Sequence, residues 1–164
     1  MITVPPRILI VSNKKDASFL REPTAPFSFR DWNKNDIRAL VRSMRAAMHR
    51  ANGVGLSANQ VGVNAKIFIA QTENKFYAIF NPELKIAAAD RVEMEEGCLS
   101  VPKRYGIVPR APKVTLTGFD QNGKRLKIKA HGLLAQIFQH EVDHLNGGLF
   151  IDRALRLFTP EPAT

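Results

Sequence analysis

The sequence QHEVDHL at residues 139–145 places His140 and His144 four positions apart, with Glu141 directly after the first histidine. Apolar residues recur around this motif at helical spacing, which predicts a buried helix over residues 132–146. Side chains at positions i and i+4 share one face of a helix, so both imidazoles can reach one metal ion. A glutamate beside such a pair can take a proton from a water that the metal activates. The motif therefore predicts a metal-dependent hydrolytic site on a buried helix.

A motif of five residues can also place two histidines on a solvated helix face by chance. The apolar neighbours argue against this, because a buried His-Glu-His group without a metal would leave polar atoms unsatisfied. A catalytic metal site needs a third protein ligand. The spacing of one class of zinc proteases would require a histidine where the chain has Phe150, and Glu161 lies between two prolines. The remaining candidates are His49, His131 and Cys98.

A second helix is predicted nearer the N-terminus. It begins near Asp36, with Asn33 or Asn35 as its cap, and its apolar residues recur at helical spacing. We expect it to stop at Gly53. The first 35 residues contain four prolines, and no element is predicted there.

Strands are predicted between the two helices. Their expected ranges are 66–71, 75–81, 113–119 and 125–130. Pro82 is expected to end the second strand, and Asn122-Gly123 between the last two is a strong hairpin signal. This order predicts an α+β fold, with mostly antiparallel sheets packed around a central metal-binding helix.

The composition is that of an ordinary globular protein. Of the 164 residues, 45% are apolar and 24% are charged. This length supports one compact domain, so we expect residues 1–164 to form a single catalytic domain that carries the hydrolytic motif. No apolar run approaches the roughly 18 residues needed to span a bilayer, which excludes a membrane-spanning helix. No secretory signal is recognisable at the N-terminus, so we expect a cytoplasmic protein without a membrane partner.

The charge balance is strongly basic. The chain has 24 Lys+Arg against 15 Asp+Glu, a net charge of +9, which favours encounters with phosphate-rich surfaces. The basic residues are scattered, and no zinc-finger, helix-turn-helix or ribonucleoprotein pattern accompanies them. We therefore expect a solvated basic face and no specific nucleic-acid site.

Cys98 is the single cysteine, so it is either a small buried hydrophobe or a thiolate with a chemical task. It lies in the sequence EGCLS at residues 96–100. Two further motifs flank it, GVGLSANQ at residues 53–60 and QHEVDHL at residues 139–145. With these three motifs in this order along the chain, the sequence resembles the peptide deformylase family. The resemblance extends over about residues 50–152.

The resemblance implies a metal-dependent amide hydrolase with a HEXXH motif. Its metal ligands would be Cys98, His140 and His144, and the ion is usually Fe²⁺, which Zn²⁺, Ni²⁺ or Co²⁺ can replace. The implied substrate is the N-formyl group on the initiator methionine of nascent polypeptides, which is released as formate. The implied process is N-terminal processing in protein biosynthesis, and the ribosome surface is a further candidate partner.

The resemblance also implies roles around the metal. Glu141 would take a proton from water and deliver one to the leaving amine, while the Gln60 side chain and the Leu99 backbone N–H would stabilise the developing oxyanion. Val54 and Gly55 would bind a strand-like substrate, because glycine lets a peptide backbone approach closely.

A methionine substrate needs an apolar pocket beside the metal. Leu133 and Ile137 lie seven and three positions before His140 on the same helix face, and they are the expected pocket residues. Gln136 shares this face, where the family generally has an apolar residue.

Glu96 and Arg110 also match the family. They are expected to form an ion pair that holds the loop around Cys98 in place.

Two rival functions follow from other classes of protein. One is a metal peptidase that uses the same helix on unformylated peptides. The other is a small basic ribosome-associated module whose metal site is vestigial. Turnover of formylated against unformylated peptides separates the first rival from a deformylase. Loss of formate release in a Glu141→Ala variant that still binds the metal excludes the second.

Overall fold

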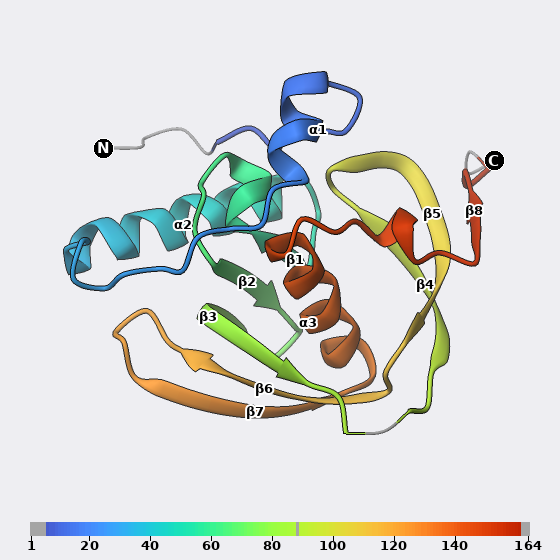
Figure 1. Cartoon of the computed structure of the whole chain (residues 1–164). Coiled ribbons are helices and arrows are strands. Elements are labelled where there is room, and N and C mark those ends of the chain that lie inside the picture. Colours follow the sequence, from blue (N-terminus) through green and yellow to red (C-terminus); the bar gives the residue numbers. More distant parts are fainter. Residues whose placement is uncertain (1–5, 88, 162–164) are drawn as a thin grey trace.

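The computed structural model describes residues 6–87 and 89–161, and these form three α-helices and two antiparallel sheets (Figure 1). The helices are α1 (Lys14–Leu20), α2 (Lys34–Arg50) and α3 (Gly132–Leu145), with the short 3-10 helices η1 (Ala58–Val61) and η2 (Phe150–Asp152). The strands are β1 (Gly55–Ser57), β2 (Ile67–Gln71), β3 (Phe76–Lys85), β4 (Val92–Cys98), β5 (Val101–Arg110), β6 (Lys113–Phe119), β7 (Arg125–His131) and β8 (Arg156–Phe158).

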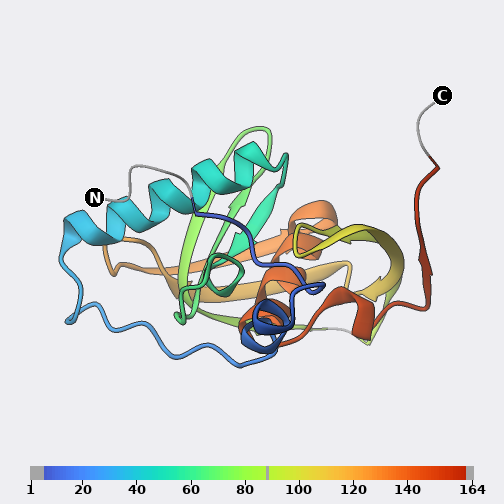
Figure 2. The same cartoon turned by 90° about the horizontal axis from the view of Figure 1, so that it is seen from above.

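The larger sheet has the order β1-β2-β3-β6-β7, with α2 and α3 on opposite faces (Figure 2). Strand β2 shows why. Ile67 and Ile69 join the apolar cluster of α2, whereas Phe68 and Ala70 join that of α3. Successive side chains of a strand point to opposite faces, so this continuous apolar run fills two cores at once.

The smaller sheet has the order β4-β5-β8 and flanks α3 on the side away from α2 (Figure 1). Its own apolar cluster contains Val101, Val108 and Phe150. Helix α3 therefore lies between the two sheets, as the sequence predicted for the metal-binding helix.

The predicted ends of α2 need adjustment. Asn33 is its cap, since the side chain accepts a hydrogen bond from the Asp36 N–H at 2.9 Å, and the helix begins at Lys34. It ends at Arg50 rather than at Gly53, whose N–H donates to the Met48 carbonyl.

The predicted end of the second strand is wrong. Strand β3 continues through Pro82 to Lys85. The pairing of β3 with β6 shifts register between Phe80 and Glu83, and Asn81 has a φ of 48°. Proline is tolerated at such a bulge, because the ladder there does not need its missing N–H.

The hairpin prediction is confirmed. β6 and β7 pair throughout, and Gly123 in their turn has a φ of 78°, which glycine adopts without strain. β7 lies at the edge of the sheet and exposes Arg125, Lys127 and Lys129 in alternation.

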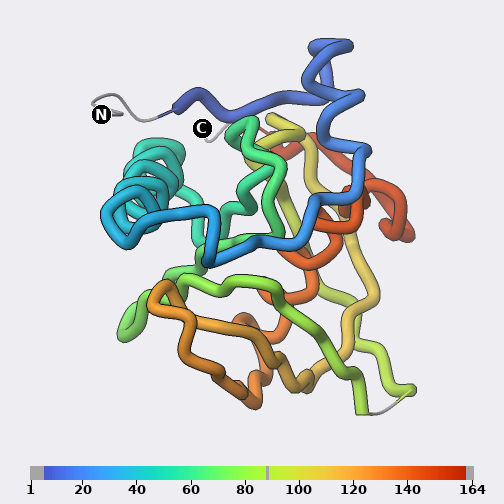
Figure 3. Tube along the Cα trace, turned by 60° about the vertical axis from the view of Figure 1, so that its left-hand side comes forward, coloured from blue at the N-terminus to red at the C-terminus, as the bar shows by residue number. Residues whose placement is uncertain are grey.

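The segment between α1 and α2 runs along one side of the molecule (Figure 3). The Thr24 N–H and hydroxyl both donate to the Leu145 carbonyl at the end of α3, at 2.8 and 3.0 Å. Among the described residues, no helix is long and apolar enough to cross a bilayer.

Candidate metal centre and its pocket

Three potential metal ligands converge where α3 meets the end of β4. The Nε2 atoms of His140 and His144 are 3.2 Å apart, and the Cys98 Sγ lies 3.2 Å from the His144 Nε2. One ligand atom from each residue lies within 4.8 Å of the others. The His144 Nδ1 is buried without a hydrogen-bond partner among the described residues. A thiolate and two imidazoles that point at one spot form the donor set of a catalytic Zn²⁺ or Fe²⁺ site.

Cys98 reaches this spot because β4 ends in a tight turn into β5. The pairing shifts register between Gly97 and Cys98, which turns the side chain toward α3. Burial alone would raise the pKa of the Cys98 thiol, but His144 and His140 outweigh burial and lower it to about 5. The site therefore favours the thiolate, which is the form that binds a metal.

A buried chain of polar groups holds His140 in place. Its Nδ1 lies 2.7 Å from a Glu96 oxygen, and Arg110 binds both oxygens of that carboxylate at 2.7 and 2.8 Å. Burial tends to raise the pKa of Glu96, but Arg110 and His140 lower it to about 2. The ionised Glu96 accepts a hydrogen bond from the His140 Nδ1–H. This fixes the tautomer in which the His140 Nε2 lone pair is left for a metal.

Glu141 is buried beside the ligands. Its Oε2 has no hydrogen-bond partner among the described residues. Burial raises the pKa of Glu141 to about 7, against the opposing effect of His140 and His144. An ideal Cβ on Gly55 would lie 2.5 Å from the Glu141 Oε1, so the absence of a side chain at position 55 gives this carboxylate its space.

Gln60 has a fixed orientation. Its Oε1 accepts hydrogen bonds from the N–H and the hydroxyl of Ser57, both at 3.0 Å. Its Nε2 therefore faces the Ser100 hydroxyl at 3.1 Å and the Cys98 Sγ at 3.7 Å. The amide N–H groups are thus directed toward the metal ligands.

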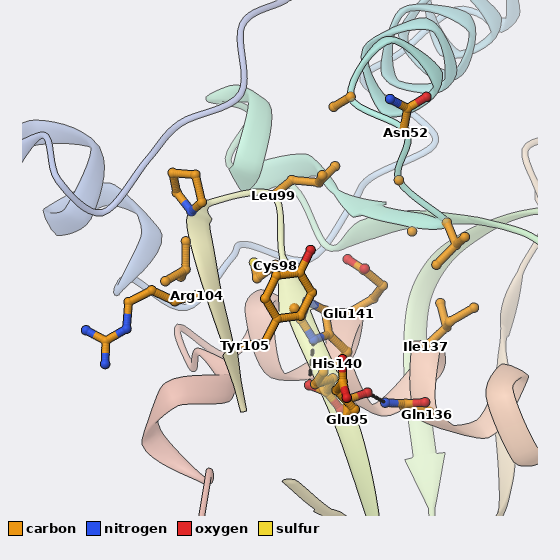
Figure 4. Close-up of a pocket in the computed structure, with 18 of the residues that line it drawn as sticks. Asn52, Glu95, Cys98, Leu99, Arg104, Tyr105, Gln136, Ile137, His140 and Glu141 are labelled. Carbon is orange, nitrogen blue, oxygen red and sulfur yellow. Dashed lines mark hydrogen bonds and ion pairs between the residues drawn. The ribbon is translucent and has the colours of Figure 1, made fainter. Parts of the chain in front are cut away.

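A pocket of about 510 Å³ opens onto the ligands (Figure 4). The predicted site residues that line it are Val54, Gly55, Gln60, Glu96, Cys98, Leu99, Leu133, Ile137, His140 and Glu141. His144 and Arg110 do not line it and are buried. The other candidate ligands, His49 and His131, are exposed, and the one ligand group found among the described residues does not include them.

Besides Ser57, which orients Gln60, two further residues have structural roles at the site that were not predicted. Asp143 accepts a hydrogen bond from the Arg110 Nη1 at 2.7 Å, and Asn59 donates to the His144 carbonyl at 2.7 Å. Both residues lie inside the motifs quoted above, and this position next to predicted site residues was the only sequence feature that pointed to them. Their partners are distant in sequence, and no local pattern identifies them.

Comparisons with known proteins agree with this geometry. The family model described as polypeptide deformylase matches residues 7–158. A peptide deformylase of Halothermothrix orenii is 47% identical over 121 residues, which cover 73% of this chain and 78% of the relative. One of Treponema pallidum is 43% identical over 117 residues, which cover 71% and 72%.

The chain belongs to the polypeptide deformylase family. It is therefore a metal-dependent hydrolase that removes the formyl group from N-formyl peptides. The family that the three motifs indicated is thus confirmed. The predicted α+β fold is confirmed as well. A peptide deformylase of Synechococcus elongatus in complex with actinonin has a TM-score of 0.84 and 34% identity, over 95% of this chain and 82% of that one.

A class I type b peptide deformylase of Acinetobacter baumannii, with Met-Ala-Ser bound, has a similar fold. Its TM-score is 0.84 at 32% identity, over 92% of this chain and 100% of that one.

Proposed function

We propose that Cys98, His140 and His144 hold one Fe²⁺ ion, which Zn²⁺, Ni²⁺ or Co²⁺ can replace, and that this site deformylates the initiator methionine of nascent polypeptides. The observation that carries the proposal is the convergence of the three ligand atoms within 4.8 Å at the base of the pocket. When bound, the ion supplies a Lewis acid that polarises the formyl carbonyl and lowers the pKa of water.

Glu141 is the proposed proton carrier. Its carboxylate lies in the pocket wall, one residue after His140, and Gly55 leaves it room to approach a substrate. It takes the proton of the attacking water and then delivers a proton to the departing methionine nitrogen. The bond between the formyl carbon and that nitrogen breaks, and the products are formate and a free amine.

Gln60 and Leu99 are the proposed oxyanion donors. Ser57 holds the Gln60 amide so that its N–H groups face Cys98, and Leu99 follows Cys98 in the turn at the pocket wall. Both can thus donate to the formyl oxygen as negative charge develops on it. Loss of one such donor typically costs about 10²–10³ in rate.

The peptide is proposed to lie between two sheet edges. β1 and β4 each lie at one edge of their sheet, and Gly55 and Gly97 from these strands both line the pocket. An extended peptide can pair with such free edges. Val54 and Gly55 would contact its backbone, and the methionine side chain would lie on Leu133 and Ile137 of α3.

Glu96 and Arg110 are proposed to fix the orientation of His140. The ribosome surface is the proposed cellular partner, because nascent chains emerge there and the net charge of +9 favours a phosphate-rich surface. The proposed place of action is the cytoplasm, in one catalytic domain over residues 1–164.

Formate release from formyl-Met-Ala-Ser, measured anaerobically together with metal analysis of the same sample, tests the proposal. We expect turnover with about one metal ion per chain. Glu141→Gln should abolish turnover and retain the metal, and Glu93→Gln, at an exposed position of β4 outside the pocket, is the matched control. Absence of both activity and stoichiometric metal in the wild type would overturn the proposal.

A further inference from the structure

A glutamine lies in the wall of the pocket proposed for the first side chain of the substrate. Gln136 follows Leu133 by one helical turn and precedes Ile137, and all three line the pocket. Its Nε2 donates to the Glu95 carbonyl of β4 at 2.7 Å, and Figure 4 shows this bond between the two residues. A side chain held at its end in this way has a defined position.

The bond to Glu95 uses only part of the hydrogen-bonding capacity of the Gln136 amide. An amide has two N–H donors and an oxygen that accepts. One N–H of Gln136 is used, and no other hydrogen bond to this side chain occurs among the described residues. The other N–H and the carbonyl oxygen of this half-buried side chain therefore remain unpaired among the described residues, in a pocket wall that Leu133 and Ile137 share.

Such a wall suits a side chain that is apolar along its length and polar near its end. Methionine sulfoxide has this form, because oxidation converts the flexible thioether into a polar group whose oxygen accepts hydrogen bonds. An entirely apolar pocket would bury that oxygen without a partner, which is costly. The second N–H of Gln136 can supply the partner.

We propose that Gln136 is a specificity-determining residue through which this enzyme also deformylates peptides that begin with oxidised formylmethionine, the sulfoxide. The inference rests on the proposed function of the pocket. The bond broken is the same formamide bond, formate and a free amine are again the products, and the sulfoxide is not reduced or otherwise changed.

The test is the ratio of kcat/KM for formyl-methionine-sulfoxide-Ala-Ser to kcat/KM for formyl-Met-Ala-Ser, measured on the metal-loaded enzyme. We expect a wild-type ratio within about 10-fold of unity. In Gln136→Met the new side chain has a similar length and no hydrogen-bond donor. The ratio of kcat/KM values should then fall a further 10-fold or more, because the sulfoxide oxygen lies unpaired in the pocket. Gln121→Leu, in the turn between β6 and β7, is the matched control and should leave the ratio unchanged.

Gln136→Glu separates hydrogen-bond donation from polarity alone. An ionised carboxylate accepts but cannot donate, so this variant should reject the sulfoxide as strongly as Gln136→Met does. Metal content and the midpoint of thermal unfolding show whether each variant is folded, and the ratio cancels a loss of active enzyme common to both substrates.

The proposal is overturned if the wild type discriminates against the sulfoxide by more than 100-fold, or if either Gln136 variant keeps the wild-type ratio. Absence of formate from both peptides in the wild type would instead overturn the proposed function. Calorimetric binding of Met-Ala-Ser and its sulfoxide to the metal-loaded protein would then decide the role of Gln136, with the same ratio of affinities expected.

Discussion

Replacement of Arg110 by alanine should weaken metal binding, although Arg110 lies outside the pocket. Arg110 does not line the pocket, yet it donates to both oxygens of Glu96 and to Asp143 at 2.7 to 2.8 Å. Glu96 in turn contacts the Nδ1 of His140. The variant would leave the buried Glu96 carboxylate without its cation, and His140, a proposed metal ligand, without a fixed support.

The magnitude follows from burial. The side chains of Arg110 and Glu96 are only 3% and 5% exposed, and removal of one partner of such a buried pair costs about 3–5 kcal/mol. Loss of a group that orients a metal ligand typically lowers metal affinity or activity about 10- to 100-fold. We therefore expect Arg110→Ala to lose several kcal/mol of unfolding free energy and at least 10-fold in metal affinity.

Arg153→Ala is the matched control. Arg153 also donates to Asp143, at 2.9 and 3.0 Å, but its side chain is 58% exposed. Exposed ion pairs contribute about 0–1 kcal/mol, so this variant should stay close to the wild type.

Urea unfolding gives the stability of both variants, and metal content after dialysis against a series of chelator concentrations gives the affinity. Formate release under saturating metal then shows how much activity the ion restores. Equal metal retention in the Arg110 and Arg153 variants, with unfolding free energies within about 1 kcal/mol, would refute the assigned role of Arg110.

Three further predictions use other parts of the structure. Gly55→Ala should lower kcat about 100-fold in protein that remains folded by circular dichroism, because the new Cβ would displace the Glu141 carboxylate; normal turnover would contradict this close approach. Arg7 lowers the pKa of Asp16 to about 2, so the stability from this pair is present above about pH 4 and is lost as the pH falls toward 2. Asp16→Asn should remove that part of the pH dependence in unfolding curves recorded between pH 2 and 6, whereas a profile identical to the wild type would exclude the contribution. Removal of the metal by a chelator should abolish formate release and lower the unfolding free energy relative to protein with excess metal, by about 2.7 kcal/mol at 100 times the dissociation constant; anaerobic Fe²⁺ should restore both, and turnover that persists without metal would contradict the site.

The parts of the fold that were predictable from sequence have a strong local signal. α3 has the apolar spacing of a buried helix and Gly147 after it with a φ of 78°, and β7 alternates basic and apolar residues after an Asn-Gly turn. These elements appear as expected. α1, by contrast, was not predicted, because it is short and its main local signal is one capping residue. The Asn13 side chain accepts hydrogen bonds from two backbone N–H groups there.

The second sheet could not be predicted for a physical reason. β4 has the sequence VEMEEGC, and most of its residues are exposed or half-buried. β5 contains Pro102 and Pro109. Their pairing with each other and with β8 stabilises these strands, and that pairing is a long-range property that their own sequences do not indicate.

The candidate site also has a part that could be predicted from sequence and a part that could not. Cys98, His140 and His144 were recognised because the motifs carry them, and the structure places them together. The contacts that support them involve main-chain atoms and residues far away in sequence, as with Asn59 and the His144 carbonyl 85 positions apart. Motif spacing identifies the reactive groups, and tertiary packing determines which neighbours hold them.

The arrangement of sheet edges has a consequence for selectivity among peptides. β7, at the far edge of the larger sheet, exposes a row of cations, which hinders the addition of another strand. β1 and the end of β4 have no such row and contribute glycines to the pocket. The main-chain pairing proposed for this pocket does not depend on a formyl group, so released products and other free N-termini should compete for it. High concentrations of newly made protein should therefore slow the enzyme through its own product.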